Sequence, residues 1–340
     1  MVRYGYCCNN MELGMQKIRT GRTMIHQKFQ EGGLQLASDI SLENAMDLLT
    51  ILQWNEERGL RLFRIGSEIF PRWNYYKLED LPEIDLIADI LCEAGDYARE
   101  HGHRLTTHPG PFNILGSPDP VVVDNTIVSL ERHSEMFDLL GYDDATPDNL
   151  INIHIGATYG DKPNTIARWL RNFDRLSDRL KARLVVENDD KASMYSVRDL
   201  YEMVHKQTGT PVTFDYWHHK FNTGDLSEEE AFYMARETYE VHGVTQCTHY
   251  SESRRKEYQK KLELICEQHN IPFDKLEEWP TFEKLYKEFS KIREQAHSDY
   301  ILELPNTYDV DNLDIEVEAK AKEQALCQIG LYKTPKILQD

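Results

Sequence analysis

The sequence predicts a single (β/α)8 TIM barrel with a helical insertion between its seventh and eighth strands. Short apolar segments alternate eight times with stretches of helix length, which is the count of that fold. The segments are apolar or β-branched on both faces, as strands of a buried parallel sheet are. The chain has 340 residues, whereas a barrel takes ~250 and tolerates insertions, so one barrel with additions accounts for the length.

The elements are expected in strict alternation along the chain. The predicted strands are 2–8, 60–66, 104–108, 151–156, 183–188, 211–216, 243–250 and 313–319. The predicted helices between them lie at about 42–58, 82–100, 120–140, 164–180, 196–208 and 227–240, with a short last one after 319. A long basic loop is expected after the first strand. The turn sequence GSPDP precedes the helix at 120 and marks its start.

The connection between the seventh and eighth strands is about 60 residues long. Residues 254–269 and 274–296 have helical character, and the sequence HNIP separates them. We expect a helical insertion at 251–296 that belongs to a barrel domain spanning 1–330. Residues 331–340 are expected to form a loosely attached tail.

The formal charge of −19 argues against nonspecific binding of nucleic acid by the surface as a whole. The charge is unevenly placed, however, and acidic metal ligands are neutralised when cations bind. Between Glu12 and Glu31 the chain carries four basic residues and no acid, and 254–261 (RRKEYQKK) is also basic. Both segments could still face a polyanion.

The six cysteines include no C-x-x-C pair, and a disulfide framework is not expected in a chain of this length. The N-terminus lacks the apolar core of a secretory signal, and no apolar run approaches the ~18 residues of a membrane span. We therefore expect an intracellular protein in a reducing compartment, without a membrane anchor.

Metal-type ligands stand at the C-terminal ends of six predicted strands. They are His108, His154, Glu187, Asp215 with His218, His249 and Glu318, and His297 joins them from the end of the insertion. Chemistry in this fold is carried at that end of the barrel. One histidine there could cap a turn or lie satisfied in the core, but a buried carboxylate such as Glu187 needs a compensating charge.

Eight candidate ligands exceed the needs of one ion, so two or three divalent cations are expected. Imidazole suits Zn, Mn or Fe, and carboxylates can bridge two cations. Two metals ~3.5–4 Å apart can activate water and stabilise the leaving oxygen in phosphodiester hydrolysis.

Several segments resemble the UV damage endonucleases, metal-dependent repair enzymes with a TIM barrel related to endonuclease IV. The resemblance runs from residue 1 to about 328, except for the insertion. The segments that carry it are GYCCNN with LG and RT following, LFRIGS, THPGP with GSPDP, IHIGATYG, VENDD, DYWHH and VEAKAKEQAL. Sugar isomerases and other metal barrels lack this set as a whole.

The resemblance implies incision of DNA immediately 5′ of a UV photoproduct, leaving a 3′-hydroxyl and a 5′-phosphate, with manganese the favoured metal. It implies the same ligands, His108, His154, Glu187, Asp215, His218, His249 and Glu318, with His297 as a further histidine. Tyr6 and Asn10 match residues that probe the duplex opposite the lesion, and Phe112 matches an aromatic position with that purpose. An apolar wedge would stabilise a kinked duplex, and a poorly stacked photoproduct is easier to extrude.

Two departures from the family pattern affect the neighbours of the predicted centre. Pro111 and Phe112 stand where members can carry Gln-Tyr, which removes hydrogen-bonding groups and keeps one aromatic face. Cys247 stands where members can carry lysine two residues before the seventh-strand histidine. A thiol there could ligate a soft metal, or the change could alter the efficiency of the reaction.

We therefore predict a monomeric, damage-specific DNA endonuclease that acts on duplex DNA. Glu187, Asp215, His249 and Glu318 are expected to carry the catalytic centre, with Glu187 and Asp215 as bridging carboxylates. The predicted phosphate contacts are Lys17, Arg19, Arg22 and Arg64. A metal-dependent sugar isomerase or epimerase on a similar barrel, and a damaged-DNA binder without catalysis, remain as alternatives.

Overall fold

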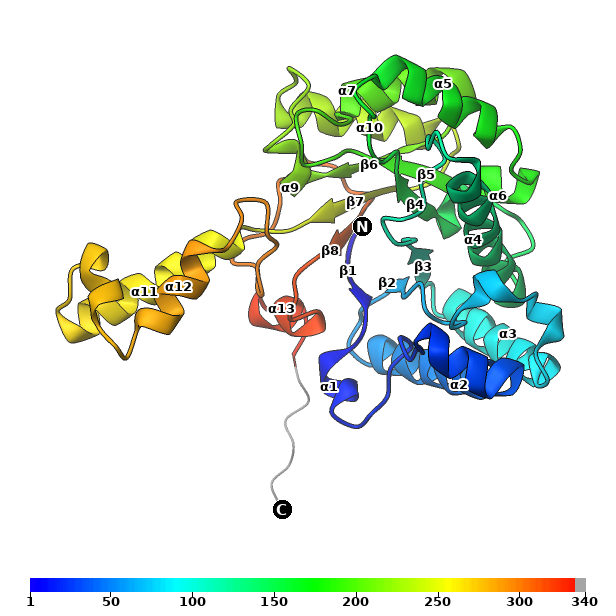
Figure 1. Ribbon diagram of the computed structural model, residues 1–340, viewed down its shortest axis with the longest axis horizontal. Helices are drawn as coiled ribbons and strands as arrows, with labels where there is room; N and C mark the ends of the chain where they lie inside the picture. The colour runs from blue at the N-terminus through cyan, green and yellow to red at the C-terminus, as the bar shows by residue number, and fades with distance from the viewer. Residues whose placement is uncertain (334–340) are drawn as a thin grey trace.

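A computed structural model describes residues 1–333 of the chain, and it contains a closed barrel of eight parallel strands (Figure 1). The strands are β1 (Val2–Cys8), β2 (Leu62–Ile65), β3 (Arg104–Thr107), β4 (Ile151–His154), β5 (Leu184–Glu187), β6 (Val212–Asp215), β7 (Gln246–Tyr250) and β8 (Leu313–Val317). Each strand pairs with the next in chain order, and β8 pairs with β1. The predicted fold class is confirmed.

Helices cover the outside of the barrel. The α-helices are α1 (Met11–Gly14), α2 (His26–Glu56), α3 (Ile84–Glu100), α4 (Pro120–Leu139), α5 (Lys162–Phe173), α6 (Asp178–Arg183), α7 (Val197–Leu200), α8 (Lys206–Thr208), α9 (Tyr216–His219), α10 (Glu228–Glu240), α11 (Arg254–His269), α12 (Glu283–Ser290) and α13 (Glu323–Gln328). The 3-10 turns are η1 (Trp73–Tyr75), η2 (Leu78–Asp80), η3 (Pro147–Asn149) and η5 (Phe273–Glu278), and η4 (Tyr201–His205) is a π-turn.

Side-chain caps explain where several helices begin. Asp119 accepts a hydrogen bond from the amide of Val121, and Pro120 occupies the first turn of α4, where its missing N–H costs nothing. Ser253 caps α11 by accepting from the amide of Lys256. These residues end the loops on the C-terminal side of the strands, so they help to fix the face of the barrel that carries the candidate site.

The interior of the barrel contains charged side chains, and two of them come from strand β8. Asp314 and Glu316 alternate with Leu313, Ile315 and Val317, and all five are fully buried. Successive side chains of a strand point to opposite faces. Glu316 contacts side chains of β2, β3 and β7, so the acids of β8 point into the barrel.

Arginines balance these interior acids. Asp314 pairs with Arg3 at 2.6 Å and with Arg104 at 2.7 Å. Arg104 also donates to the backbone oxygens of Pro147, Asp148 and Thr245, which closes the end of the barrel opposite to the strand C-termini. The layer below the candidate site is therefore fixed by buried ion pairs.

Several predicted helices differ in extent from the observed ones. The first was expected at 42–58, but α2 already begins at His26, inside the expected basic loop, and is interrupted at Gly33, whose φ is 57°. The helix expected at 164–180 is divided into α5 and α6, and that at 196–208 into α7, η4 and α8. Gly33 thus separates a short first segment of α2 from the main helix, which packs against α3.

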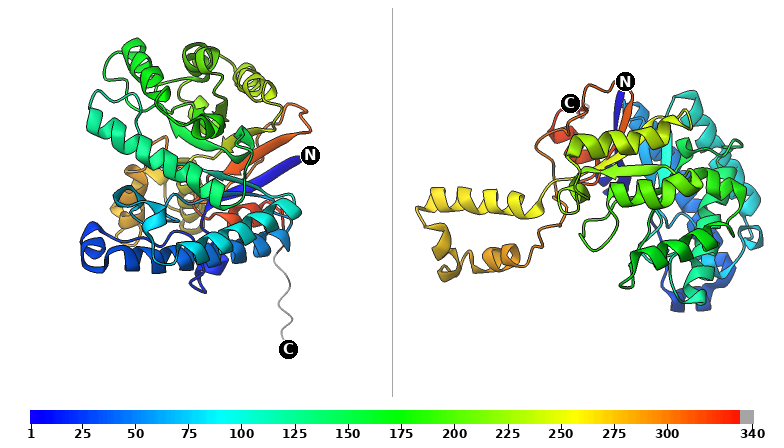
Figure 2. Two further views of the ribbon diagram at one scale, coloured as in Figure 1. Left: turned by 90° about the vertical axis from the view of Figure 1, so that its right-hand side faces the viewer. Right: turned by 90° about the horizontal axis from the view of Figure 1, so that it is seen from above.

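The predicted insertion is a helical arm, which we define as residues 254–296. Figures 1 and 2 show α11 and α12 side by side, projecting away from the barrel on the side of β7 and β8. The region predicted as one helix at 274–296 is η5 followed by α12. A small core of its own holds the arm together, formed by Leu262, Ile271, Leu276 and Phe289.

Only the first three residues of the expected C-terminal tail are described. Among these, Tyr332 is buried, with its ring centroid 5.7 Å from that of Trp54. The remaining residues of the expected tail, 334–340, lie outside the described part of the chain. No helix within residues 1–333 has the length and apolar character needed to cross a membrane.

Candidate metal centre

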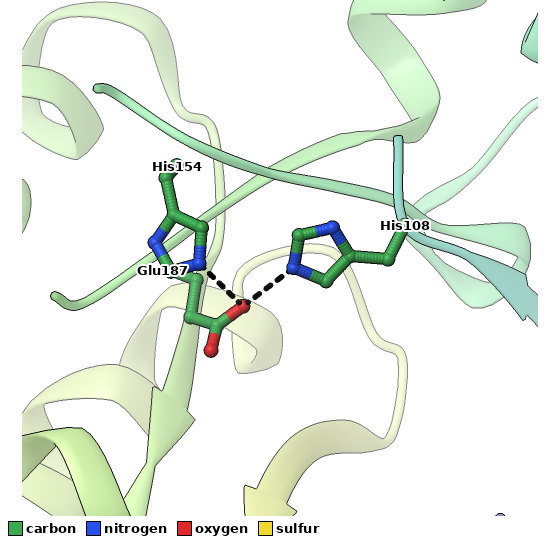
Figure 3. A group of neighbouring side chains, drawn as sticks. All are labelled: His108, His154 and Glu187. Carbon is green, nitrogen blue, oxygen red and sulfur yellow. Dashed lines mark hydrogen bonds and ion pairs between the residues drawn. The ribbon is translucent and has the colours of Figure 1, made fainter. Parts of the chain in front are cut away.

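Glu187, at the end of β5, lies at the centre of a cluster of histidines. Its Oε2 is 3.1 Å from Nε2 of His108 and 3.7 Å from Nε2 of His154 (Figure 3). Its Oε1 is 3.1 Å from Nδ1 of His249 and 3.3 Å from Nδ1 of His218. Four histidines from four different strand ends therefore converge on the two oxygens of one buried carboxylate.

Three further candidates lie beside this cluster. Nδ1 of His297 is 3.3 Å from Glu318 Oε2, and Nδ1 of His249 is 3.6 Å from Glu318 Oε1. Asp215 Oδ2 is 3.7 Å from Nδ1 of His218. The structure thus brings all eight candidate ligands of the sequence together at one end of the barrel.

Two groups of these side chains have the geometry to hold a metal ion. One comprises His108, His154 and Glu187, and the other comprises Glu187, Asp215 and His249, with the ligand atoms of each group within 4.8 Å of one another. Glu187 belongs to both groups. A carboxylate shared in this way is the arrangement expected of a bridge between two cations.

The chemistry of the donors fits divalent metals. Asp215 Oδ2 is buried and makes no hydrogen bond within residues 1–333, and the buried ring nitrogens of His249 face only carboxylates. Buried polar atoms without partners are costly unless another group satisfies them. A set of imidazole nitrogens and carboxylate oxygens suits Mn, Fe or Zn.

The electrostatics of the cluster show the same need for positive charge. Burial raises the pKa of Glu187, but the neighbouring His249 and His154 outweigh burial and hold it well below its usual range. Burial lowers the pKa of His249, yet Glu187 reverses this and raises it to about 10. The carboxylates therefore require cationic partners, either protons on the imidazoles or metal ions.

Further residues hold the candidate ligands in place, a role that was not predicted for them from the sequence. Glu316 lies 3.2 Å from His249 Nε2 and accepts hydrogen bonds from Arg64 Nε at 2.8 Å and from Thr106 Oγ1. Arg64 also donates to Glu318. The alternation of acids in LDIEVE was the available signal for Glu316, but it does not reveal the partners.

A second set of neighbouring groups orients His154 and His218. Asp189 Oδ1 is 3.1 Å from Nδ1 of His154, and the backbone oxygen of Asn188 is 2.9 Å from Nδ1 of His218. Asn152 donates to Glu187. Outer partners of this kind fix the ring orientation of metal-binding histidines and raise their basicity.

Cys247 lies apart from the metal-binding groups. Its side chain is fully buried among Leu150, Val185 and Tyr239, and burial raises the pKa of its thiol well above the usual value. Neither candidate metal group found within residues 1–333 includes it.

The residues predicted to contact a lesion fall into two sets. Tyr6 and Asn10 are buried: the hydroxyl of Tyr6 donates to Asn55 Oδ1 at 2.8 Å and accepts from Asn10 Nδ2 at 3.0 Å. Pro111 is exposed, and Phe112 is 87% exposed. Phe112 borders a cavity of about 740 Å³ that is also lined by Glu68, Trp73, Tyr75, Asn125 and His133.

The four predicted phosphate contacts differ in accessibility. Lys17 and Arg19 are exposed and form no ion pair within residues 1–333. Arg22 is engaged with Glu43 at 2.9 Å and with Asp47 at 2.6 Å. Arg64 is buried between Glu316 and Glu318.

The fold and the cluster together define a class, that of TIM-barrel proteins with a candidate divalent-metal centre at the C-terminal ends of the strands. Comparison with known proteins adds the particular family. The chain belongs to the UV-endonuclease UvdE family, whose family model matches residues 2–337.

Individual relatives agree with this assignment. The UV-damage endonuclease of Schizosaccharomyces pombe is 32% identical over 335 residues, which cover 96% of this chain and 50% of the relative. The UV-damage endonuclease of Neurospora crassa is 33% identical over 320 residues, which cover 90% of this chain and 42% of the relative. The chain therefore spans about half the length of these two relatives or less. The crystal structure of SacUVDE superimposes with a TM-score of 0.75 at 26% identity, covering 97% of this chain and 96% of that one.

Proposed function

We propose that this chain is a metal-dependent DNA repair endonuclease that hydrolyses the phosphodiester 5′ of UV photoproducts, leaving a 3′-hydroxyl and a 5′-phosphate. The observation that carries the proposal is the position of Glu187, whose two oxygens face two separate candidate metal groups. Membership in the UvdE family supports damaged duplex DNA as the substrate.

The residues of the centre would have different roles in the reaction. Glu187 and Asp215 would hold the cations, and the five histidines with Glu318 would complete their ligand shells. Two or three Mn²⁺ ions bound there would activate water and neutralise the charge of the scissile phosphate. The outer carboxylates, Glu316 and Asp189, keep the imidazoles oriented.

The exposed and the buried residues predicted to contact the lesion would take part in its recognition in different ways. Phe112 projects into solvent and is free to insert beside a poorly stacked photoproduct. Tyr6 and Asn10 have to become exposed before they touch DNA, since both are buried here. Lys17 and Arg19 are available for phosphates, whereas Arg64 would first have to leave Glu316 and Glu318. We expect the enzyme to act as an intracellular monomer.

The test is incision of a 5′-labelled duplex that carries one defined photoproduct, in the presence of Mn²⁺. The length of the labelled product gives the position of the cut, extension by a DNA polymerase reports a 3′-hydroxyl, and sealing by a DNA ligase reports the 5′-phosphate. An undamaged duplex and a reaction with chelator are the controls. Binding without incision would indicate a damaged-DNA binder instead of an endonuclease. The absence of both binding and incision would overturn the proposal as a whole.

A further inference from the structure

The base of the arm is fixed next to the candidate metal centre. The amide of Arg254 donates to the backbone oxygen of Ala296, and Ser253 forms a β-bridge with His297, so the two ends of the arm are joined. Trp217 Nε1 donates to the oxygen of Gln295 at 2.9 Å. His297 and His218 are thus direct neighbours of the segments that anchor the arm.

Positive charge is concentrated at this base, which we call the root and define as residues 254–261. The root holds five Lys or Arg and one Glu, whereas the rest of the arm, 262–296, holds five Lys or Arg and eight Asp or Glu. The whole chain carries −19. The arm is therefore basic where it meets the barrel and acidic beyond that.

A groove of about 220 Å³ lies at the root, and we call it the root groove. Its lining includes Trp217, Lys220, Tyr250, Lys256, Lys260 and Tyr300. The three lysines have no carboxylate within ion-pair distance among residues 1–333. Lys220 is held 5.2 Å from the ring centroid of Trp217, a cation–π contact that leaves its charge uncompensated.

The acids of the root groove are mostly occupied by other donors. Glu252 Oε1 accepts from the amides of Leu302 and Glu303. Glu257 accepts from the amide of Asp299 and from Lys261 Nζ. Glu303 is then the carboxylate of this lining that faces the three lysines without such a partner. The lining holds three lysines and three glutamates, and Lys261 balances Glu257, so the lysines outnumber the carboxylates without an ion pair by one.

We propose that the root groove binds the sugar–phosphate backbone of the DNA duplex outside the incision site, through Lys220, Lys256 and Lys260. Lys256 and Lys260 are four residues apart on α11 and lie on one face of the helix. The root adjoins the metal centre, so a duplex lying across the strand ends passes the lysines as it leaves the barrel. The inference rests on the proposed function, and it extends the DNA footprint to the base of the arm.

The experiment measures the salt dependence of duplex binding by the full-length protein. Each phosphate neutralised by a lysine contributes about 0.9 to the slope of log K against log[salt]. The triple variant Lys220→Gln, Lys256→Gln, Lys260→Gln is expected to lower that slope by about 2.7 if all three bind phosphates. The loss is expected for damaged and undamaged duplexes alike, because backbone contacts carry no sequence information.

A matched control removes three lysines elsewhere on the arm, Lys275→Gln, Lys284→Gln and Lys287→Gln. This variant has the same net charge, and its slope is expected to stay at the wild-type value. Circular dichroism and thermal melting verify that both variants are folded. A root variant with the wild-type slope, or a control with an equal loss, overturns the proposal.

Failure of the root-groove proposal can be distinguished from failure of the proposed endonuclease function. If the wild-type protein fails to incise damaged DNA, the endonuclease proposal fails, but the binding slopes still test the root groove. If the wild type incises and the root variant binds with an unchanged slope, only the root groove is overturned. If the root variant loses binding of an acidic peptide while its DNA binding is unchanged, the groove is instead assigned to a protein partner.

Discussion

Replacing Glu316 by glutamine is expected to weaken metal binding although Glu316 belongs to neither candidate metal group. Glu316 lies between His249 Nε2 and the guanidinium of Arg64. An imidazole nitrogen that donates to a carboxylate leaves the other nitrogen as an acceptor. Glu316 therefore keeps Nδ1 of His249 turned towards Glu187 and available as a ligand.

The size of the effect follows from what glutamine cannot do. It has the shape of glutamate, but one of its oxygens is replaced by an amide that donates, so it cannot accept from Thr106, Arg64 and His249 together. Loss of such an outer carboxylate typically costs 10- to 100-fold in metal affinity. We expect a weakening of about 1.4 to 2.8 kcal/mol for Mn²⁺.

Titration calorimetry with Mn²⁺ measures this affinity directly, without DNA or activity. Asp314→Asn is the matched control, because Asp314 lies two residues earlier on β8 and its loss removes the same charge from the barrel interior. Asp314 pairs with Arg3 and Arg104, so its variant is expected to melt at a lower temperature but to bind Mn²⁺ normally. Wild-type Mn²⁺ affinity in Glu316→Gln would refute the reasoning.

Three further predictions concern other parts of the chain. Glu187→Gln is expected to abolish incision in a gel assay while damaged DNA is still bound; retained nicking would contradict its role in metal binding. Phe112→Ala is expected to weaken binding of a photoproduct-containing duplex by about 1 to 3 kcal/mol relative to an undamaged one, and equal losses for both duplexes in fluorescence anisotropy would argue against a wedge. Burial lowers the pKa of His133 to about 4, so the folded protein binds fewer protons than the unfolded chain between about pH 4 and 6.5. The free energy of unfolding therefore falls by about 3 kcal/mol as the pH drops through that window, and urea titrations should show that His133→Gln removes this part of the dependence.

The barrel and its candidate ligands could be predicted from the sequence because both depend on local patterns. Apolar segments such as RLVVE and INIH mark buried strands, and a ligand at the end of each one has its position fixed by the fold. Parallel strands that close a barrel place their ends together, so the convergence of His154, Glu187 and His249 followed from topology alone.

The remaining features depend on contacts that the sequence does not display. The start of α2 at His26 was missed because Gly32 and Gly33 disfavour helix; a short helical segment precedes them, and the helix is interrupted at Gly33. The partners of Glu316 come from β2, β3 and β7, which are far away in the chain. Likewise, nothing in the sequence indicated that Tyr6 is covered by its own neighbours.

The alternating acids of β8 link the completion of the fold to the completion of the site. A slip of β8 by one residue would turn Asp314 and Glu316 towards the helices and leave Arg3, Arg64 and Arg104 without their partners. The last strand can therefore dock in only one register. Because the same strand brings Glu316 and the adjoining Glu318, a barrel whose eighth strand is not yet paired cannot hold the full set of ligands.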